Sequence, residues 1–290
     1  MLTNQQALAR MADDIQLRGL SQSTVRNYST AVREFLRFTG QPIGELDETN
    51  IRKYLIHLID EKKFEPKTVN LHSSAIRFFF AVTLNRTMNY LQIPRMKEPK
   101  KLPDILTRDE VLQLIAQASN AKHKALMLTA YGSGLRVSEL VSLKVTDIDS
   151  KSMRVFVRGG KGKKDRYTIL SEKSLLALRD YWRKYRPKNP EGYIFPSSKG
   201  AGHLHKDTVG YAIDRAHSIA GFRKKASAHT LRHCFATHLL EDGYSIFQIK
   251  DMLGHSSIRS TIIYLHLANT TSGVTSPADK LPEKFECAPL

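Results

Sequence analysis

The feature that most constrains this chain is a proline-rich stretch at residues 90–103. Pro94, Pro99 and Pro103 alternate there with basic side chains, and no helical period of apolar residues runs through the stretch. Repeated prolines resist regular secondary structure, and mixed charge keeps a segment solvated. Because 290 residues are enough for two ordinary domains, the stretch predicts an interdomain linker. The predicted parts are a domain at 1–89, the linker at 90–103, a domain at 104–269 and a tail at 270–290.

The first domain is predicted to be a bundle of four helices. Apolar residues recur at spacings of three and four, as Met11 and Ile15 do in the first helix. Ser21 or Ser23 offers an N-cap for the second helix, and Gly40 ends it. No segment of this part predicts a strand, and the expected helices cover about 4–16, 21–39, 47–58 and 66–80.

The second domain is predicted to be mainly helical with one β-hairpin. Thr107 followed by Glu110 fits a capping box, which starts a helix at 108–118. The runs 153–158 and 166–170 are β-prone and flank a turn rich in glycine and lysine. The fold class is therefore α+β and mainly α, with further helices expected at 122–132, from 136, and at 171–185, 206–219, 229–241, 245–253 and 257–266.

Net charge gives the first indication of function. The chain carries 45 Lys and Arg against 28 Asp and Glu, a formal net charge of +17. The excess is spread over both predicted domains and is not confined to a basic tail. In a folded protein such an excess indicates a polyanionic partner, with nucleic acid as the leading candidate. The alternative is a basic surface that binds nothing.

Other features indicate a cytoplasmic protein. No run approaches the roughly 18 consecutive apolar residues of a membrane span, so no membrane partner is expected. The N-terminus lacks the basic and apolar regions of a secretory signal. The two cysteines, Cys234 and Cys287, are too few for a disulfide framework, which favours a reducing compartment.

Two basic motifs in the second domain are suited to binding phosphate. Arg136 follows a glycine at a helix start, and Glu139 lies one turn on, where it can orient the arginine. The turn of the hairpin, Arg158 to Arg166, has five basic residues and three glycines among nine positions. Glycine lets such a loop approach a phosphate backbone closely. The nucleotide-binding pattern GxxxxGK[ST] is absent, so nucleotide binding is not indicated.

Two further motifs of this domain contain histidine. His229 and Arg232 are three residues apart in the segment HTLRH and therefore share a helix face. His255 follows in the segment LGH, and Tyr264 comes nine residues later. His229 and His233 also have the spacing of metal ligands. No HExxH motif or Cys/His pair accompanies them, so no metal is expected.

The four motifs occur in one order, GLRVSEL, GGKGKKDR, HTLRHCFATHLL and LGHSSIRSTIIY. In that order they resemble the tyrosine recombinase (phage integrase) family, most closely its Xer and integron-integrase branches. The resemblance implies a SAM-like core-binding domain at 1–89 and a catalytic domain at 104–269. It implies site-specific recombination of DNA, as integration, excision or resolution, for a mobile element. The alternatives are a non-cleaving DNA-binding regulator on this fold and a relaxing enzyme similar to type IB topoisomerases.

The resemblance also assigns roles in cleavage. Tyr264 is the nucleophile, which forms a 3′-phosphotyrosyl link to DNA. Arg136 and Arg232 hold the scissile phosphate, in agreement with the forked, permanently charged guanidinium group. Lys161 is the general acid that protonates the departing 5′-oxygen. Hairpin register cannot be read from sequence, so Lys163 and Lys164 are rivals for that role.

The remaining expected site residues support this chemistry. His229 accepts or relays the tyrosine proton, His255 contacts the phosphate or positions Tyr264, and Glu139 orients Arg136 and the neighbouring histidine. No cofactor, ATP or metal is required, because the covalent intermediate stores the bond energy. The expected DNA contacts are basic residues of both domains, namely Arg26, Arg33, Lys67, Arg77, Arg158, Lys163, Lys164 and Arg166.

The resemblance further implies the state of assembly. The protein is expected to act as a homotetramer on two DNA duplexes, and to be a monomer or weak dimer when free. In the family a C-terminal segment packs on the neighbouring subunit. The tail at 270–290 is the expected counterpart, with Leu281 or Phe285 as its apolar anchor.

Overall fold

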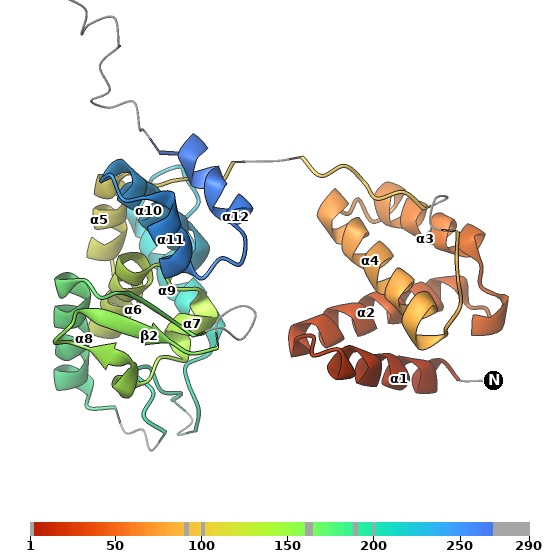
Figure 1. Ribbon diagram of the computed structural model, residues 1–290, viewed down its shortest axis with the longest axis horizontal. Coiled ribbons are helices and arrows are strands. Elements are labelled where there is room, and N and C mark those ends of the chain that lie inside the picture. The colour runs from red at the N-terminus through yellow and green to blue at the C-terminus, as the bar shows by residue number, and fades with distance from the viewer. Residues whose placement is uncertain are drawn as a thin grey trace, which may run out of the picture. The chain divides into compact units, whose positions relative to one another are not determined.

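The computed structural model describes residues 3–89, 93–99, 102–159, 165–187, 191–198 and 201–268. Its contacts divide the chain into two compact units, Met1–Lys101 and Leu102–Leu290 (Figure 1). The mainly helical α+β class expected from the sequence is confirmed. Within the described ranges, no helix is both long enough and apolar enough to cross a membrane.

The first unit is a bundle of helices with the expected local signals at their ends. The Thr3 side chain caps the first helix in a capping box with Gln6, and Ser21 caps the second. Gly40 ends the second helix in the left-handed conformation, as expected. The fourth helix ends earlier than predicted and passes into a π-helical turn. The elements are α1 (Asn4–Leu17), α2 (Gln22–Thr39), η1 (Ile43–Glu45), α3 (Glu48–Asp60), α4 (Pro66–Phe78) and η2 (Phe79–Thr83).

Part of the proline-rich stretch packs against the first unit. Ile93 is 2% exposed and belongs to the apolar core of that unit. The side chain of Asn70 donates to the carbonyl oxygen of Met96 at 3.0 Å and accepts from its backbone N–H at 2.9 Å. Residues 93–99 are therefore not fully solvated, contrary to the expectation for a linker. The prolines exclude a helix in this segment. Ile93 and Met96 nevertheless pack against the core of the first unit, although two isolated apolar residues show no helical period in the sequence.

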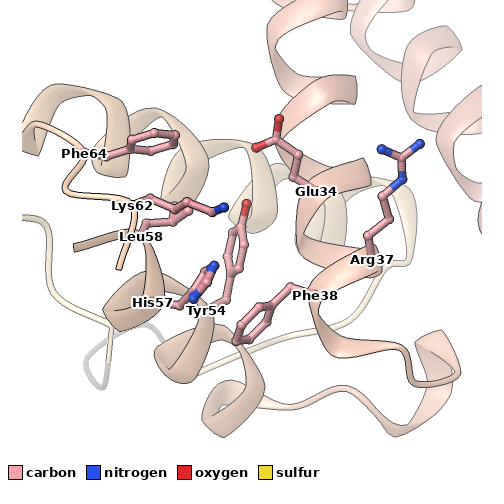
Figure 2. Close-up of a pocket in the computed structure, with 8 residues that line it drawn as sticks. All are labelled: Glu34, Arg37, Phe38, Tyr54, His57, Leu58, Lys62 and Phe64. Atoms are coloured by element: carbon pink, nitrogen blue, oxygen red, sulfur yellow. The ribbon is translucent and has the colours of Figure 1, made fainter. Parts of the chain in front are cut away.

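A pocket of about 480 Å³ opens between α2 and α3 of the first unit (Figure 2). The ring of Phe38 contacts those of Tyr54 and His57, with centroids 5.3 and 4.7 Å away. The Tyr54 hydroxyl and Nδ1 of the buried His72 are hydrogen-bonded at 3.0 Å. None of the residues that line the pocket is an expected catalytic residue; they are Glu34, Arg37, Phe38, Tyr54, His57, Leu58, Lys62 and Phe64.

The second unit contains a three-stranded antiparallel sheet of order β1-β2-β3. The hairpin of β2 (Arg154–Val157) and β3 (Arg166–Ile169) is confirmed, with Val157 opposite Arg166. The sequence did not predict β1 (Ile148–Asp149), because two residues are too short to show a period. The other elements are α5 (Arg108–Ala116), α6 (Ala121–Ser133), α7 (Val137–Val141), η4 (Val145–Asp147), α8 (Glu172–Tyr185), α9 (Lys206–Ala220), α10 (Ala228–Glu241), α11 (Ile246–Leu253), α12 (Arg259–Ile262) and η5 (Ile263–His266).

Two features of this unit position the residues that matter below. Helix α6 packs against both α8 and α10, and Arg232 of α10 donates to the carbonyl oxygen of Gly134, where α6 ends (Figure 1). The helix expected at 257–266 is instead one α-turn, α12, followed by the 3₁₀ turn η5. Tyr264 lies on η5 and is buried among Phe235, Leu253 and Ile249.

Candidate active site

A buried ion cluster forms around the carboxylate of Glu139. Arg136 precedes α7 as its N-cap residue, and its backbone N–H and Nη1 donate to Glu139 at 2.8 and 2.7 Å. From β3, Arg166 donates to both carboxylate oxygens, at 3.0 and 2.7 Å. Nη1 of Arg232 lies 3.6 Å from the same group. Three guanidinium groups therefore face one carboxylate, an excess of two positive charges.

Arg232 is held in place by backbone carbonyls. It is 1% exposed, and it donates to the carbonyl oxygens of Gly134 at 2.7 Å and Leu253 at 2.6 Å. Gly134 adopts a φ of +60°, and a side chain there would collide with the ring of Phe235, 2.3 Å from the added carbon. The glycine before the Arg136 motif thus lets α6 end beside α10.

Tyr264 is hydrogen-bonded to a histidine that sequence reasoning did not select. The hydroxyl lies 2.9 Å from Nδ1 of His233, and Tyr264 is 2% exposed. His229, the expected proton acceptor, is exposed, and its ring lies edge-on to that of His233 with centroids 4.4 Å apart. From the sequence, His233 is a candidate only for metal binding. The sequence feature that points to His233 is its position one helical turn after His229.

His255 lies beside both Arg232 and the tyrosine. Its Nε2 is 3.2 Å from Nη2 of Arg232, and its Nδ1 is hydrogen-bonded to the hydroxyl of Thr261 at 2.9 Å. Its ring is nearly parallel to that of Tyr264, with centroids 6.5 Å apart. Five of the expected residues, Arg136, Glu139, Arg232, His255 and Tyr264, therefore meet in one place.

Burial sets the protonation states in this cluster. Burial lowers the pKa of His233 to about 4, and the nearby His229 and Arg232 act in the same direction. Burial, with Arg232 and Arg136, likewise lowers the pKa of His255 to about 4. Both imidazoles are therefore neutral at pH 7 and able to accept a proton. Burial raises the pKa of Tyr264, while the two arginines oppose that rise.

The charges of the arginine cluster persist at neutral pH. Burial alone would raise the pKa of Glu139, but hydrogen bonds from Arg166 and Arg136 outweigh it and lower that pKa to about 2. Burial and the neighbouring Arg136 lower the pKa of Arg232 to about 10, so it remains protonated. An anion is the natural complement of such a site, because the carboxylate neutralises only part of the buried positive charge.

The expected DNA contacts differ in their surroundings. Lys161, Lys163 and Lys164 lie outside the described residues, as does the tail at 270–290. Arg166, by contrast, is buried on Glu139, and Arg158 is paired with Asp147 at 2.7 Å. In the first unit Arg26, Arg33 and Lys67 are exposed, whereas Arg77 is half-buried and donates to the carbonyl oxygen of Ile93.

The contacts of Glu139 differ from the expected ones in one respect. Arg136 and a neighbouring histidine were its expected partners, whereas three arginines, Arg136, Arg166 and Arg232, contact it in the structure. Among the described residues, no group of three or more His, Cys, Asp or Glu side chains is arranged to hold a metal ion.

The fold and the site together define a class of protein. Residues 104–271 match the phage integrase family, and residues 8–90 match the N-terminal SAM-like domain of phage integrases. The chain is 42% identical to the integrase/recombinase y4qK of Sinorhizobium fredii, over 97% of this chain and 91% of that protein. It is 35% identical to tyrosine recombinase XerD of Rickettsia bellii, over 86% and 90%. The chain belongs to the phage integrase family and is a tyrosine-type site-specific recombinase.

Solved structures share the fold at lower identity. One is the XerH recombinase bound to its palindromic difH substrate, with a TM-score of 0.72 and 19% identity over 94% of this chain and 83% of that one. Another is a lambda integrase tetramer bound to a Holliday junction, with a TM-score of 0.71 and 21% identity over 98% and 80%.

Proposed function

We propose that this recombinase cuts and rejoins duplex DNA with Tyr264 as its nucleophile. The observation that carries the proposal is the meeting of Tyr264, a neutral imidazole and a buried cluster with excess positive charge. A scissile phosphate would supply the missing negative charge. Arg136 and Arg232 would then bind its non-bridging oxygens, where charge develops in the transition state.

The proposed cleavage step conserves atoms and charge. The bond between the Tyr264 oxygen and phosphorus forms, the bond from phosphorus to the 5′-oxygen breaks, and a 3′-phosphotyrosyl link remains. His233 receives the tyrosine proton, because its Nδ1 is the atom in hydrogen-bonding distance. Lys161 protonates the departing 5′-oxygen, a role carried from the family resemblance. Attack by a 5′-hydroxyl on the link reverses the step and joins the strands.

The nucleophile must become accessible before it can react. Tyr264 is 2% exposed, and its hydroxyl is engaged by His233. It lies on η5, and only one turn of helix, α12, separates it from the His255 segment. We therefore propose that η5 shifts only enough to admit the scissile phosphate, while the Tyr264 hydroxyl stays within hydrogen-bonding distance of His233.

Duplex DNA and further copies of the chain are the proposed partners. The net charge of +17 supports a polyanionic partner, and recombinases of the same fold are described on DNA and as a tetramer on a Holliday junction. We also propose that the protein acts as a tetramer on two duplexes and is a monomer or weak dimer when free. Its proposed role is to move a mobile element, in association with the nucleoid. The tail at 270–290 is the proposed subunit-exchange segment.

Covalent selection tests the function without a known target site. Nicked duplexes with a randomised centre are incubated with the protein, and species that survive denaturation are sequenced. Wild-type protein should enrich one family of sites. Tyr264→Phe should give no covalent product yet bind the recovered duplex with unchanged affinity, because only the attacking oxygen is lost. Tyr244→Phe, an exposed tyrosine of the same unit, is the matched control.

The outcomes separate the alternatives. A regulator that does not cleave would bind the duplex but yield no covalent product with either protein. A relaxing enzyme would enrich no sequence and would relax any supercoiled plasmid. A covalent product that persists in Tyr264→Phe would contradict the assignment of the nucleophile.

A further inference from the structure

Arg166 begins β3, and its side chain points into the buried ion cluster. The side chain is 8% exposed. Its Nη1 and Nη2 donate to the two oxygens of Glu139 at 3.0 and 2.7 Å, and its Nε donates to the carbonyl oxygen of Met252 at 2.8 Å. Each of the three nitrogens therefore has a protein acceptor. Such a group is poorly placed to bind DNA, which was the role expected from its sequence position.

The carboxylate that Arg166 holds also holds Arg136. Oε1 of Glu139 accepts from Arg136 Nη1 at 2.7 Å, and Oε2 accepts from the Arg136 backbone N–H at 2.8 Å. Each oxygen thus receives one hydrogen bond from each arginine, which fills its usual acceptor capacity. Glu139 can rotate only by breaking bonds to both arginines. The orientation of the Arg136 guanidinium consequently depends on Arg166.

The stem of Arg166 also occupies the turn that leads to His255. Gly254 has a φ of +63°, and a Cβ added there would lie 2.8 Å from Cδ and 3.0 Å from Nε of Arg166. The next residue, His255, lies 3.2 Å from Arg232. One side chain therefore connects β3 to α7, which Arg136 precedes, and to the end of α11, which His255 follows.

We propose that Arg166 is a positioning residue for recombination: it fixes Glu139, and through it Arg136, in the orientation that receives the scissile phosphate. This inference rests on the proposed function, because it requires Arg136 to bind that phosphate. The pairing is bidentate, and lysine keeps the charge but cannot form the fork. Arg166→Lys should therefore remain impaired, and Arg166→Gln should be impaired more.

The test compares two scissile linkages on the duplex recovered by covalent selection. One carries the ordinary phosphodiester, and the other a methylphosphonate, which has no negative charge at the scissile phosphorus. Single-turnover formation of the covalent product is measured for each. On the phosphodiester we expect Arg166→Gln to be slower by about 10²-fold and Arg166→Lys by about tenfold, with DNA affinity within about threefold of wild type. On the methylphosphonate, where less charge must be stabilised, both should fall within about threefold of wild type.

Arg154→Gln removes an exposed arginine from the adjacent strand β2 and should match wild type on both linkages. Fluorescence of Trp182, the single tryptophan, verifies folding of the second unit, and if Arg166→Gln is unfolded the same ratio is taken for Arg166→Lys. Equal slowing on both linkages would indicate a merely structural role and overturn the proposal. A rate of the Arg166 variants within about twofold of wild type on the phosphodiester would also overturn the proposal. The Tyr264-dependent covalent product of the wild-type protein is demonstrated before the Arg166 variants are compared. A failure of the proposed function is therefore distinguished from a failure of the role proposed for Arg166.

Discussion

Both units bury polar side chains, but they balance them differently. In the first unit the members of two neutral pairs are hydrogen-bonded to each other: Tyr54 with His72 at 3.0 Å, and Asn70 with the backbone of Met96. In the second unit three arginines surround Glu139. Buried charge is costly unless it is paired. A balanced network therefore indicates a structural role, whereas an excess of buried positive charge indicates a site built for an anion.

The largest effect should come from removing the one negative charge of the cluster. Glu139→Gln leaves the buried arginines without their carboxylate, and the second unit should lose about 3–5 kcal/mol of stability. Urea unfolding followed by Trp182 fluorescence measures this unit alone. Sulfate should restore more stability to the variant than to wild type, because it can replace the lost anion.

A matched substitution in the first unit sharpens that result. Glu34 lies 4.0 Å from His72 and is 46% exposed, so Glu34→Gln should change stability by no more than about 0.5 kcal/mol. Pulse proteolysis of the full chain, followed through peptides released from the first unit, measures this change in stability. If Glu34→Gln and Glu139→Gln lost equal amounts of stability, the proposed difference between the polar networks of the two units would be wrong.

Acid should weaken the second unit more steeply than the first. Unfolded histidine has a pKa of about 6.5, whereas His233 and His255 have a pKa of about 4 in the folded protein. Between these values the unfolded state binds protons that the folded state does not. Stability is therefore intact above about pH 6.5 and falls toward pH 4, by up to about 1.4 kcal/mol per pH unit for each histidine.

The comparison with the first unit supplies the control for acid. Burial also lowers the pKa of His72 there, so that unit should also weaken as the pH falls, but through fewer histidines. In the second unit burial lowers the pKa of His123 and His238 as well. Urea midpoints measured at stepped pH for each unit test this. Parallel slopes would contradict the assignment of neutral histidines to the site.

Loss of a single hydrogen bond to a buried histidine should cost less stability than loss of the Glu139 carboxylate. Tyr54→Phe removes the bond to His72 Nδ1, and Thr261→Val removes the bond to His255 Nδ1. Each should cost its unit about 1–2 kcal/mol, because a buried nitrogen loses its partner. Cleavage rate should change only for Thr261→Val, by about tenfold, since His255 adjoins Arg232. If Tyr54→Phe also slowed cleavage at saturating DNA, the two hydrogen bonds would not differ in their effect on the reaction.

The sequence by itself determined the class of fold and the family, and it selected five residues that the structure brings together. Helix ends followed from local rules that need few neighbours, as at Thr107, Ser21 and Gly40. The order of four motifs indicated the family, and five expected residues do meet. These inferences succeeded because capping, periodicity and motif spacing are properties of neighbouring residues along the chain.

Only the tertiary structure decided which partners these residues have. Arg166 looked like one more basic residue of a hairpin turn, yet it is buried on Glu139, twenty-seven positions earlier. His233 contacts Tyr264 across thirty-one positions, and the docking of Ile93 ends the idea of a fully solvated linker. Contacts between distant segments depend on how α7, α10 and η5 pack. No local pattern encodes that packing, because the same arginine or histidine can face water or a carboxylate at equal spacing in the chain.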